Sequence, residues 1–191
     1  MKYITNRYES VKLPWEPGLV EWLQQRYPKS QYRIVEIMPK VYVLVGVPGA
    51  GKSTWVANQE WAKDCAYVST DKHVDTHAEI VGKTYNEVFK DFMPSAVKMM
   101  SAEVELARSA GKDIIWDQTS TTVSSRKKKF NMLPDYEHIA VVFKTPELVE
   151  LNRRLKSRPG KSIPSHVMVQ MIKGWQDPTV EEGYAEVWNA S

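Results

Sequence analysis

The stretch VYVLVGVPGAGKSTWV, residues 41–56, constrains this chain more than any other part of its sequence. Five residues suited to a buried strand are followed by glycines, a lysine and two hydroxyl side chains. Residues 46–53 match the complete pattern G-x-x-x-x-G-K-[ST]. Glycines let the backbone curl so that successive N–H groups point at one anion, and a following helix adds its unpaired amides and positive dipole end. The pattern therefore predicts a triphosphate-binding loop.

The side chains of this loop have separate expected roles. Lys52 is a mobile point charge for the β- and γ-phosphates, and the Ser53 hydroxyl is a neutral oxygen ligand for Mg²⁺. ATP and Mg²⁺ are therefore the expected cofactors. The residues expected to contact the nucleotide are Gly46, Val47, Pro48, Gly49, Ala50, Gly51, Lys52, Ser53 and Thr54.

Composition narrows the class of protein. The chain has 191 residues, which suits one domain with a small appendage, and its net charge of +3 permits a polyanionic partner without demanding one. Its one cysteine, Cys65, is expected to be a small core residue, which excludes a disulfide-linked partner and a cysteine-built zinc site. No apolar run approaches ~18 residues and the start lacks the apolar block of a signal peptide, so we expect a cytoplasmic protein with no membrane contact.

The order of apolar runs predicts the fold class. Short β-rich runs alternate with helix-like segments after residue 40, which is typical of βα units around a parallel sheet. Residues 41–191 are therefore predicted to form an α/β domain of the P-loop NTPase type, a three-layer sandwich with a parallel sheet of about five strands and a lid segment. Strands are expected at 42–45, 67–69, 114–116 and 139–143, with an extra edge strand at 34–37. Helices are expected at 52–63, 84–109, 121–132, 146–157 and 165–175.

Local signals bound the second of these helices. Thr84 and Glu87 fit a capping box at its start, and Gly111 stands where it should stop. Pro94 is expected to break or kink it near Met93.

Residues 1–40 differ from the rest in composition. The segment 13–33 carries three prolines, two tryptophans and two tyrosines. We expect an aromatic, proline-rich arm that packs on the core and buries Trp15 and Trp22, because exposed aromatic side chains need a reason. The alternative is a surface on which nucleic-acid bases stack.

Asp117 follows the predicted strand 114–116 in the sequence KDIIWDQTS. It is expected beside the phosphate-binding loop, where an acid holds Mg²⁺ directly or through water. The alternative is an aspartate that forms a turn or caps a helix.

Asp71 follows the predicted strand 67–69 in the sequence AYVSTDKHVD. Carboxyl ends of parallel strands are where α/β sheets bind ligands, so Asp71 is expected to face the same crevice. A carboxylate there can accept the proton of an attacking hydroxyl, as a kinase requires. His73 and Asp75 are alternatives for this base, and His73 is otherwise expected at the surface or against the acceptor.

Two basic runs, 125–130 and 153–161, hold nine lysines and arginines together. Solvated helix faces are the alternative explanation for both runs. In 152–164 the positive charge ends a helix that Pro-Gly then breaks, and such a hinged segment can close over the triphosphate and stabilise charge on the transferred group. Arg158 is the first candidate for this role and Arg154 the second.

Four motifs in this order resemble a known family. The phosphate-binding loop, STD at 69–71, WDQT at 116–119 and R-x-G-K-x-I-P at 158–164 are similar to those of P-loop kinases related to phage polynucleotide 5′-hydroxyl kinase. Phage enzymes that phosphorylate 5-hydroxymethyluracil within DNA share this core, and zeta-toxin-type kinases are more distant. The similarity covers about residues 41–175 and leaves the N-terminal arm outside.

The resemblance implies a role for each matching residue. Lys52 and Ser53 contact ATP and Mg²⁺, Asp71 is the general base, Asp117 belongs to the metal network and Arg158 is the lid arginine. Further substrate or lid contacts are expected from Lys72, His73, Arg154 and Lys161.

One position departs from the family. Polynucleotide 5′-kinases place an arginine three residues after the base aspartate, and this chain has Val74 there. Lys72 and His73 are substitutes that lack the forked grip of arginine. No D-x-D-G-T phosphatase motif is present either.

The predicted function is an ATP-dependent kinase that phosphorylates a hydroxyl on DNA. Val74 favours the hydroxymethyl group of a modified pyrimidine, 5-hydroxymethyluracil in phage DNA, and such a base must leave the stack to reach the site. The alternatives are a polynucleotide 5′-hydroxyl kinase and a kinase of a nucleotide or another small molecule. A motor-like NTPase is disfavoured because the chain is short.

Overall fold

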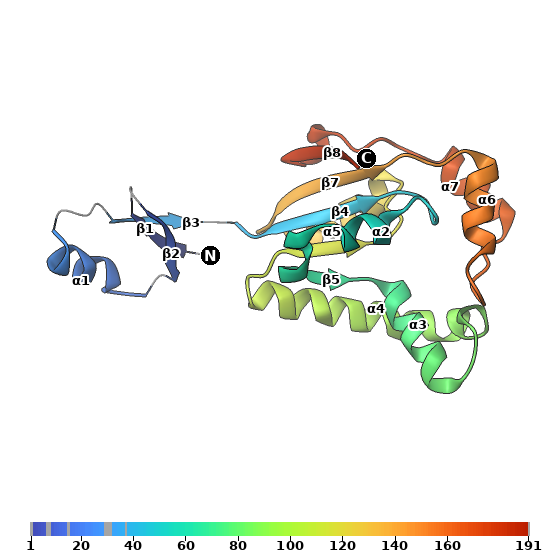
Figure 1. The fold of residues 1–191 in the computed structure, drawn as a ribbon, viewed down its shortest axis with the longest axis horizontal. Coiled ribbons are helices and arrows are strands. Elements are labelled where there is room, and N and C mark those ends of the chain that lie inside the picture. The colour runs from blue at the N-terminus through green and yellow to red at the C-terminus, as the bar shows by residue number, and fades with distance from the viewer. Residues whose placement is uncertain (1, 7–8, 15, 29–31, 37, 191) are drawn as a thin grey trace. The chain divides into compact units, whose positions relative to one another are not determined.

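The computed structural model describes residues 2–6, 9–14, 16–28, 32–36 and 38–190 (Figure 1). The chain divides into two compact units, Met1–Pro39 and Lys40–Ser191.

The N-terminal unit has a sheet of its own. The strands β1 (Lys2–Asn6), β2 (Glu9–Pro14) and β3 (Tyr32–Glu36) pair antiparallel in the order β2-β1-β3, and α1 (Leu19–Arg26) connects β2 to β3. The edge strand predicted at 34–37 was therefore assigned to the wrong sheet, because β3 pairs with β1; residue 37 lies outside the described residues.

The predicted burial of Trp22 is also wrong, since this side chain is 56% exposed. Leu23 is the buried residue of α1, and neighbouring helical positions point about 100° apart. Trp15 lies outside the described residues.

The C-terminal unit is built on a parallel sheet of five strands in the order β5-β6-β4-β7-β8. Every neighbouring pair runs parallel. The predicted α/β fold of the P-loop type, with about five parallel strands, is confirmed. The strands are β4 (Lys40–Val45), β5 (Ala66–Val68), β6 (Ile114–Asp117), β7 (Glu137–Phe143) and β8 (Glu186–Ala190).

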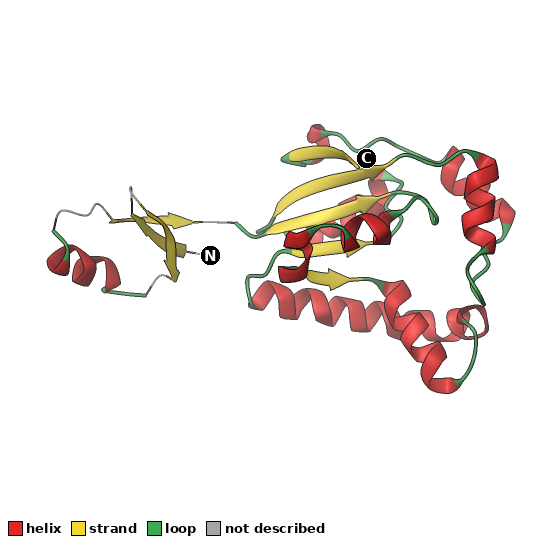
Figure 2. Ribbon diagram, viewed as in Figure 1, coloured by secondary structure: helices red, strands yellow, loops and turns green. Residues whose placement is uncertain are grey.

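The central strand β4 shows why the sheet is covered on both faces. Val41, Val43 and Val45 belong to the core cluster that includes residues of α4 (Tyr85–Ser109). Tyr42 and Leu44 point to the opposite face, where α2 (Lys52–Ala57) packs. Successive strand residues alternate between faces, so a continuous apolar run requires two covered faces. The result is three layers (Figure 2).

Several elements differ from those predicted. The helix predicted at 52–63 ends at Ala57 and is followed by the 3₁₀ helix η1 (Glu60–Asp64). An unpredicted helix, α3, spans Thr70–Val81, and β8 was not predicted either. The remaining helices are α5 (Val123–Met132), α6 (Leu148–Lys156), α7 (Ser165–Lys173) and the 3₁₀ helix η2 (Val180–Glu182).

The long helix α4 keeps its predicted ends. Thr84 and Glu87 form the capping box, in which the Glu87 carboxylate accepts the Thr84 backbone N–H at 2.7 Å. Gly111 follows the helix with φ 60°. Pro94 does not break the helix, which continues through it to bury Ala96 and Met100. Burial of this apolar stripe offsets the one hydrogen bond that proline removes.

Among the residues that the structure describes, no helix has both the length and the apolarity to span a bilayer. Cys65 is a free, half-buried thiol beside the Tyr42 cluster, and burial raises its pKa to about 11. The thiolate form is therefore scarce near neutral pH.

Candidate active site

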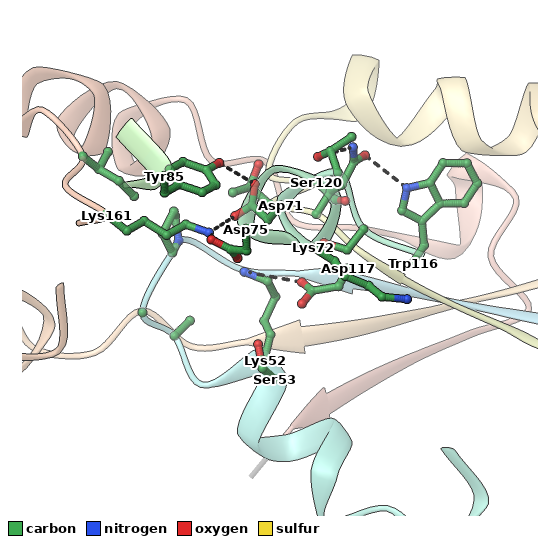
Figure 3. Close-up of a pocket in the computed structure, with 18 of the residues that line it drawn as sticks. Lys52, Ser53, Asp71, Lys72, Asp75, Tyr85, Trp116, Asp117, Ser120 and Lys161 are labelled. Carbon is green, nitrogen blue, oxygen red and sulfur yellow. Dashed lines mark hydrogen bonds and ion pairs between the residues drawn. The ribbon is translucent and has the colours of Figure 1, made fainter. Parts of the chain in front are cut away.

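A cavity of about 1810 Å³ opens where the strands of the parallel sheet end. Residues 48–54, Asp71, Asp117 and Arg158 all line it. Pockets for a single drug-sized ligand occupy roughly 300–1,000 Å³, so this cavity has room for two substrates. Figure 3 shows Lys52 and Ser53 from α2 facing the aspartates of neighbouring elements.

The phosphate-binding loop connects β4 to α2 and depends on its glycines. Gly49 and Gly51 have φ values of 85° and 98°, which residues with a Cβ rarely adopt. A Cβ on Gly46 would lie 2.9 Å from the Cβ of Phe143, and the Gly46 N–H donates to the Thr119 carbonyl at 2.9 Å. Glycine is therefore required for both the curl of the loop and its contact with the sheet.

Lys52 lies across the mouth of this loop. Its Nζ donates to the carbonyls of Gly46 at 3.0 Å and Val47 at 3.3 Å, and lies 4.0 Å from Asp117 Oδ1. Burial lowers the pKa of Lys52, while Asp117 and Asp71 oppose that change. The ammonium is thus held by neutral carbonyls that phosphate oxygens can replace.

Tyr67 lies near the two residues predicted to hold Mg²⁺. Its hydroxyl donates to Asp117 Oδ2. Burial, reinforced by Asp117, raises the pKa of Tyr67, and the nearby Ser53 side chain acts to lower it. The Asp117 carboxylate and the Ser53 hydroxyl line one cavity and are the hard oxygen donors that Mg²⁺ prefers, so the residues fit this ion. Tyr67 was not predicted as a site residue, although its place in β5, beside the strand that ends at Asp117, was a usable signal.

Asp71 is held by two side chains in this cavity. Its Oδ1 accepts a hydrogen bond from the Tyr85 hydroxyl at 2.9 Å, and its Oδ2 lies 2.9 Å from Lys161 Nζ (Figure 3). Lys161 also lies 3.3 Å from Asp75 Oδ2 and 3.8 Å from the centre of the Tyr85 ring. The Asp71 side chain is 53% exposed, so a substrate hydroxyl can reach it. Tyr85 was not predicted as a site residue either.

The predicted lid is the segment between α6 and α7. Its Ser162 exchanges hydrogen bonds with Asn86 near the start of α4, and Gly160 packs against Thr84. Arg158 lines the cavity, and its charge contributes to lowering the pKa of Lys52. The segment therefore bridges the phosphate-binding loop and the start of α4.

Arg154, the second lid candidate, contacts the phosphate-binding loop itself. Its Nη1 donates to the Gly49 carbonyl at 3.2 Å and its Nε to Glu150 at 2.6 Å. Glu150, between two arginines, has its pKa lowered to about 2. Arg154 therefore braces the loop from α6.

His73 does not contact the acceptor space, contrary to the prediction. It does not line the cavity, its side chain is 9% exposed and its Nε2 lies 3.1 Å from Glu103 Oε2. His73 lies two positions after Asp71 in α3, about 200° further around the helix, so its ring turns toward α4. Lys72 does line the cavity, 3.9 Å from Glu103, and Val74 is fully buried.

The fold and this site define a kinase-like P-loop domain. The chain belongs to the AAA domain family AAA_33, whose family model matches residues 41–178.

A related sequence and several solved structures support this family assignment. The bifunctional polynucleotide phosphatase/kinase of Schizosaccharomyces pombe (strain 972 / ATCC 24843) is 26% identical over 153 residues, which cover 78% of this chain and 32% of that protein. This chain thus spans about a third of that relative's length. The predicted relationship to polynucleotide-kinase-like proteins is confirmed.

Solved structures share the fold. A putative kinase from Chloroflexus aurantiacus J-10-fl superposes with a TM-score of 0.62 at 16% identity, covering 80% of this chain and 89% of that one. A chain of the Pnkp1/Rnl/Hen1 RNA repair complex superposes with a TM-score of 0.55 at 21% identity, covering 73% of this chain and 45% of that one. At these identities the similarity is one of fold.

Proposed function

We propose that this chain is an ATP- and Mg²⁺-dependent kinase that transfers the γ-phosphate to a hydroxyl group on DNA. The observation that carries the proposal is the exposed Asp71 carboxylate, which shares one cavity with Lys52 and the phosphate-binding loop. A transferase needs a base beside its phosphate donor, and a cavity with room for two substrates. The polynucleotide kinase relative supports a nucleic-acid acceptor.

In the proposed reaction Asp71 accepts the proton of the acceptor hydroxyl as that oxygen forms a bond to the γ-phosphorus. The bond from the γ-phosphorus to the bridging oxygen breaks, and its electron pair leaves with ADP. Lys52 and Arg158 supply positive charge for the oxygens of the transferred group. Mg²⁺ held by Ser53 and Asp117 would supply charge neutralisation at the phosphate oxygens. Tyr85 orients the Asp71 carboxylate through its hydrogen bond.

The proposed acceptor is the hydroxymethyl group of a modified pyrimidine such as 5-hydroxymethyluracil in phage DNA. Val74 supports it, because this buried valine offers no cation to a terminal nucleotide. The second candidate is a 5′-terminal hydroxyl, which the polynucleotide kinase relative favours.

The test is phosphate transfer from γ-labelled ATP to three acceptors: hydroxymethylpyrimidine DNA, 5′-hydroxyl oligonucleotides and free nucleosides. We expect the wild-type protein to label hydroxymethylpyrimidine DNA, and we expect no labelled product when DNA is left out of the reaction. Label confined to free nucleosides, with no competition by DNA, would make the chain a small-molecule kinase. Lys52→Ala should abolish transfer, and Lys63→Ala, on the exposed surface of η1, is the matched control.

A further inference from the structure

Lys129 on α5 is a buried cation that the proposed reaction does not use. The residue is 3% exposed. Its Nζ donates to the Ser125 carbonyl of its own helix at 3.2 Å and lies 5.4 Å from the centre of the Trp116 ring. Within the part of the chain that the structure describes, no carboxylate lies within ion-pair distance of it. Burial, then the charges of Arg126 and Lys128, lower its pKa to about 8.

Arg126, one helical turn earlier, shows how this fold normally treats a buried charge. It is fully buried, and its guanidinium makes two hydrogen bonds to Glu182, at 2.7 and 2.9 Å. It also donates to the carbonyls of Ser120 and Gln176. Buried charges are paired in this way because desolvation is costly. Lys129 is therefore an exception within its own helix, and a ligand is the natural counter-ion.

The cavity that holds the phosphate-binding loop reaches Lys129. Lys128 and Lys129 both line it, as do Trp116 and Ser120. The acidic residues that line the cavity come from α3 and from the end of β6, so the α5 wall carries only positive charge; these acidic residues are Asp71, Asp75, Glu79 and Asp117. An anion placed against α5 thus meets two lysines.

Ser120 gives a second, independent indication of a ligand. Its side chain is 2% exposed, it lines the same cavity, and its Oγ has no hydrogen-bond partner among the described residues. It also has φ 50°, in the left-handed region that non-glycine residues avoid. An unpaired buried hydroxyl and a strained backbone both cost free energy, and such residues cluster at ligand sites.

We propose that Lys128 and Lys129 of α5, together with Ser120 in the loop before this helix, bind a phosphate group of the nucleic-acid acceptor. This inference rests on the proposed function for the identity of the acceptor. A phosphate offers several acceptor oxygens, so the ammonium of Lys129 and the hydroxyl of Ser120 each gain a partner. The contact positions the strand and reads no base.

The experiment measures binding of a fluorophore-labelled single-stranded oligonucleotide by anisotropy, in the absence of ATP. We expect Lys129→Met to weaken binding at least tenfold and to reduce the slope of log Kd against log salt by about one. Lys127→Met is the matched control, because Lys127 lies in the same basic run, is exposed and does not line the cavity; a change below twofold is expected. Ser120→Ala should weaken binding less than Lys129→Met and should keep ATP affinity.

Two further arms identify the source of the phosphate. An oligonucleotide with neutral methylphosphonate linkages should bind weakly and equally to wild type and Lys129→Met. If a nucleoside 3′-monophosphate competes as well as the oligonucleotide does, the site binds a free nucleotide and the proposal of a nucleic-acid strand is overturned. Equal oligonucleotide affinity in wild type and Lys129→Met, or no binding to wild type, would overturn the site.

This assay separates the site from the reaction. If the oligonucleotide binds through Lys129 but never receives label from ATP, the proposed function fails and the phosphate site stands. If label is transferred with the same KM in Lys129→Met and wild type, the function stands and the phosphate site fails.

Discussion

Lys161 Nζ lies 2.9 Å from Asp71 Oδ2, and this ion pair ties the lid between α6 and α7 to the start of α3. An ammonium on that oxygen competes with the proton of an acceptor hydroxyl. We therefore expect the pair to separate before Asp71 acts as a base. A triphosphate in the neighbouring loop offers Lys161 a more highly charged partner, so ATP binding and release of Asp71 are expected to be coupled.

Lys161→Met tests this relationship. We expect kcat to fall at least tenfold, because the lid loses a cation that can reach the transferred phosphate. The free energy of unfolding should change by less than ~1 kcal/mol, because Asp71 and Asp75 are half exposed and such ion pairs are weak. Kinetics and chemical denaturation measure the two quantities. Lys156→Met, at an exposed position of α6, is the control. If Lys161→Met keeps the wild-type kcat but loses much of its stability, Lys161 serves only to hold the lid against α3.

Asp71→Asn tests the general base. The amide keeps the shape of the carboxylate and can still accept the Tyr85 hydrogen bond, but it cannot take a proton. We expect kcat to fall about 10²–10⁴-fold with ATP affinity within a few-fold of wild type. Single-turnover transfer and binding of a non-hydrolysable ATP analogue measure these separately. Asp75→Asn, which alters the other partner of Lys161, should lower kcat only a few-fold, and a wild-type rate in Asp71→Asn would exclude it as base.

The features predictable from sequence are those encoded by neighbouring residues. The strand, glycine turn and helix of residues 41–56 form one local signal, and the pair Thr84 and Glu87 predicts the start of α4. The edge strand β8 lacks such a signal, because it lies at the end of the strand order beside β7 and its residues are half-buried or exposed. The polar residues of α3 hide its buried stripe, which is Thr70, His73, Val74 and Ala78.

The parts of the site that depend on packing between distant elements escaped prediction. Tyr85 meets Asp71 because α4 lies against α3, and Tyr67 meets Asp117 because β5 pairs with β6. In the basic run 125–130 a usable signal was present. Arg126 and Lys129 are three residues apart, so both fall on the inner face of α5, whereas Lys127 turns outward and the exposed Lys128 lines the cavity.

Tyr67→Phe tests the support of the Mg²⁺ site. Removing one hydroxyl leaves Asp117 Oδ2 without its hydrogen-bond donor. Loss of such outer contacts typically costs about 10–100-fold in metal affinity, so the Mg²⁺ concentration for half-maximal rate should rise in that range. The rate at saturating Mg²⁺ should recover most of its wild-type value. Tyr42→Phe, in the aromatic cluster beneath α2, should leave the Mg²⁺ dependence unchanged, and a Tyr67→Phe curve that matches wild type would remove Tyr67 from the site.

Lys129→Met is expected to increase the stability of the fold, although it weakens oligonucleotide binding. Burial lowers the pKa of Lys129 from 10.5 in the unfolded chain to about 8 in the fold, so its charged form is penalised by roughly 3 kcal/mol. At pH 7, below both pKa values, the whole penalty is present. Lys129→Met should therefore be more stable than wild type, despite losing the hydrogen bond to Ser125.

The sign of the pH dependence follows from proton counts. Between pH 8 and 10.5 the unfolded wild-type chain holds more protons at Lys129 than the folded chain, so wild-type stability rises with pH relative to Lys129→Met. The stability advantage of Lys129→Met should therefore narrow from pH 7 to pH 10, as measured by denaturant unfolding of both proteins at each pH. Lys127→Met should show a constant difference from wild type. A Lys129→Met protein that is less stable at pH 7 would mean that the ammonium serves the fold, with its bond to Ser125 and its contact with Trp116 outweighing the cost of burial.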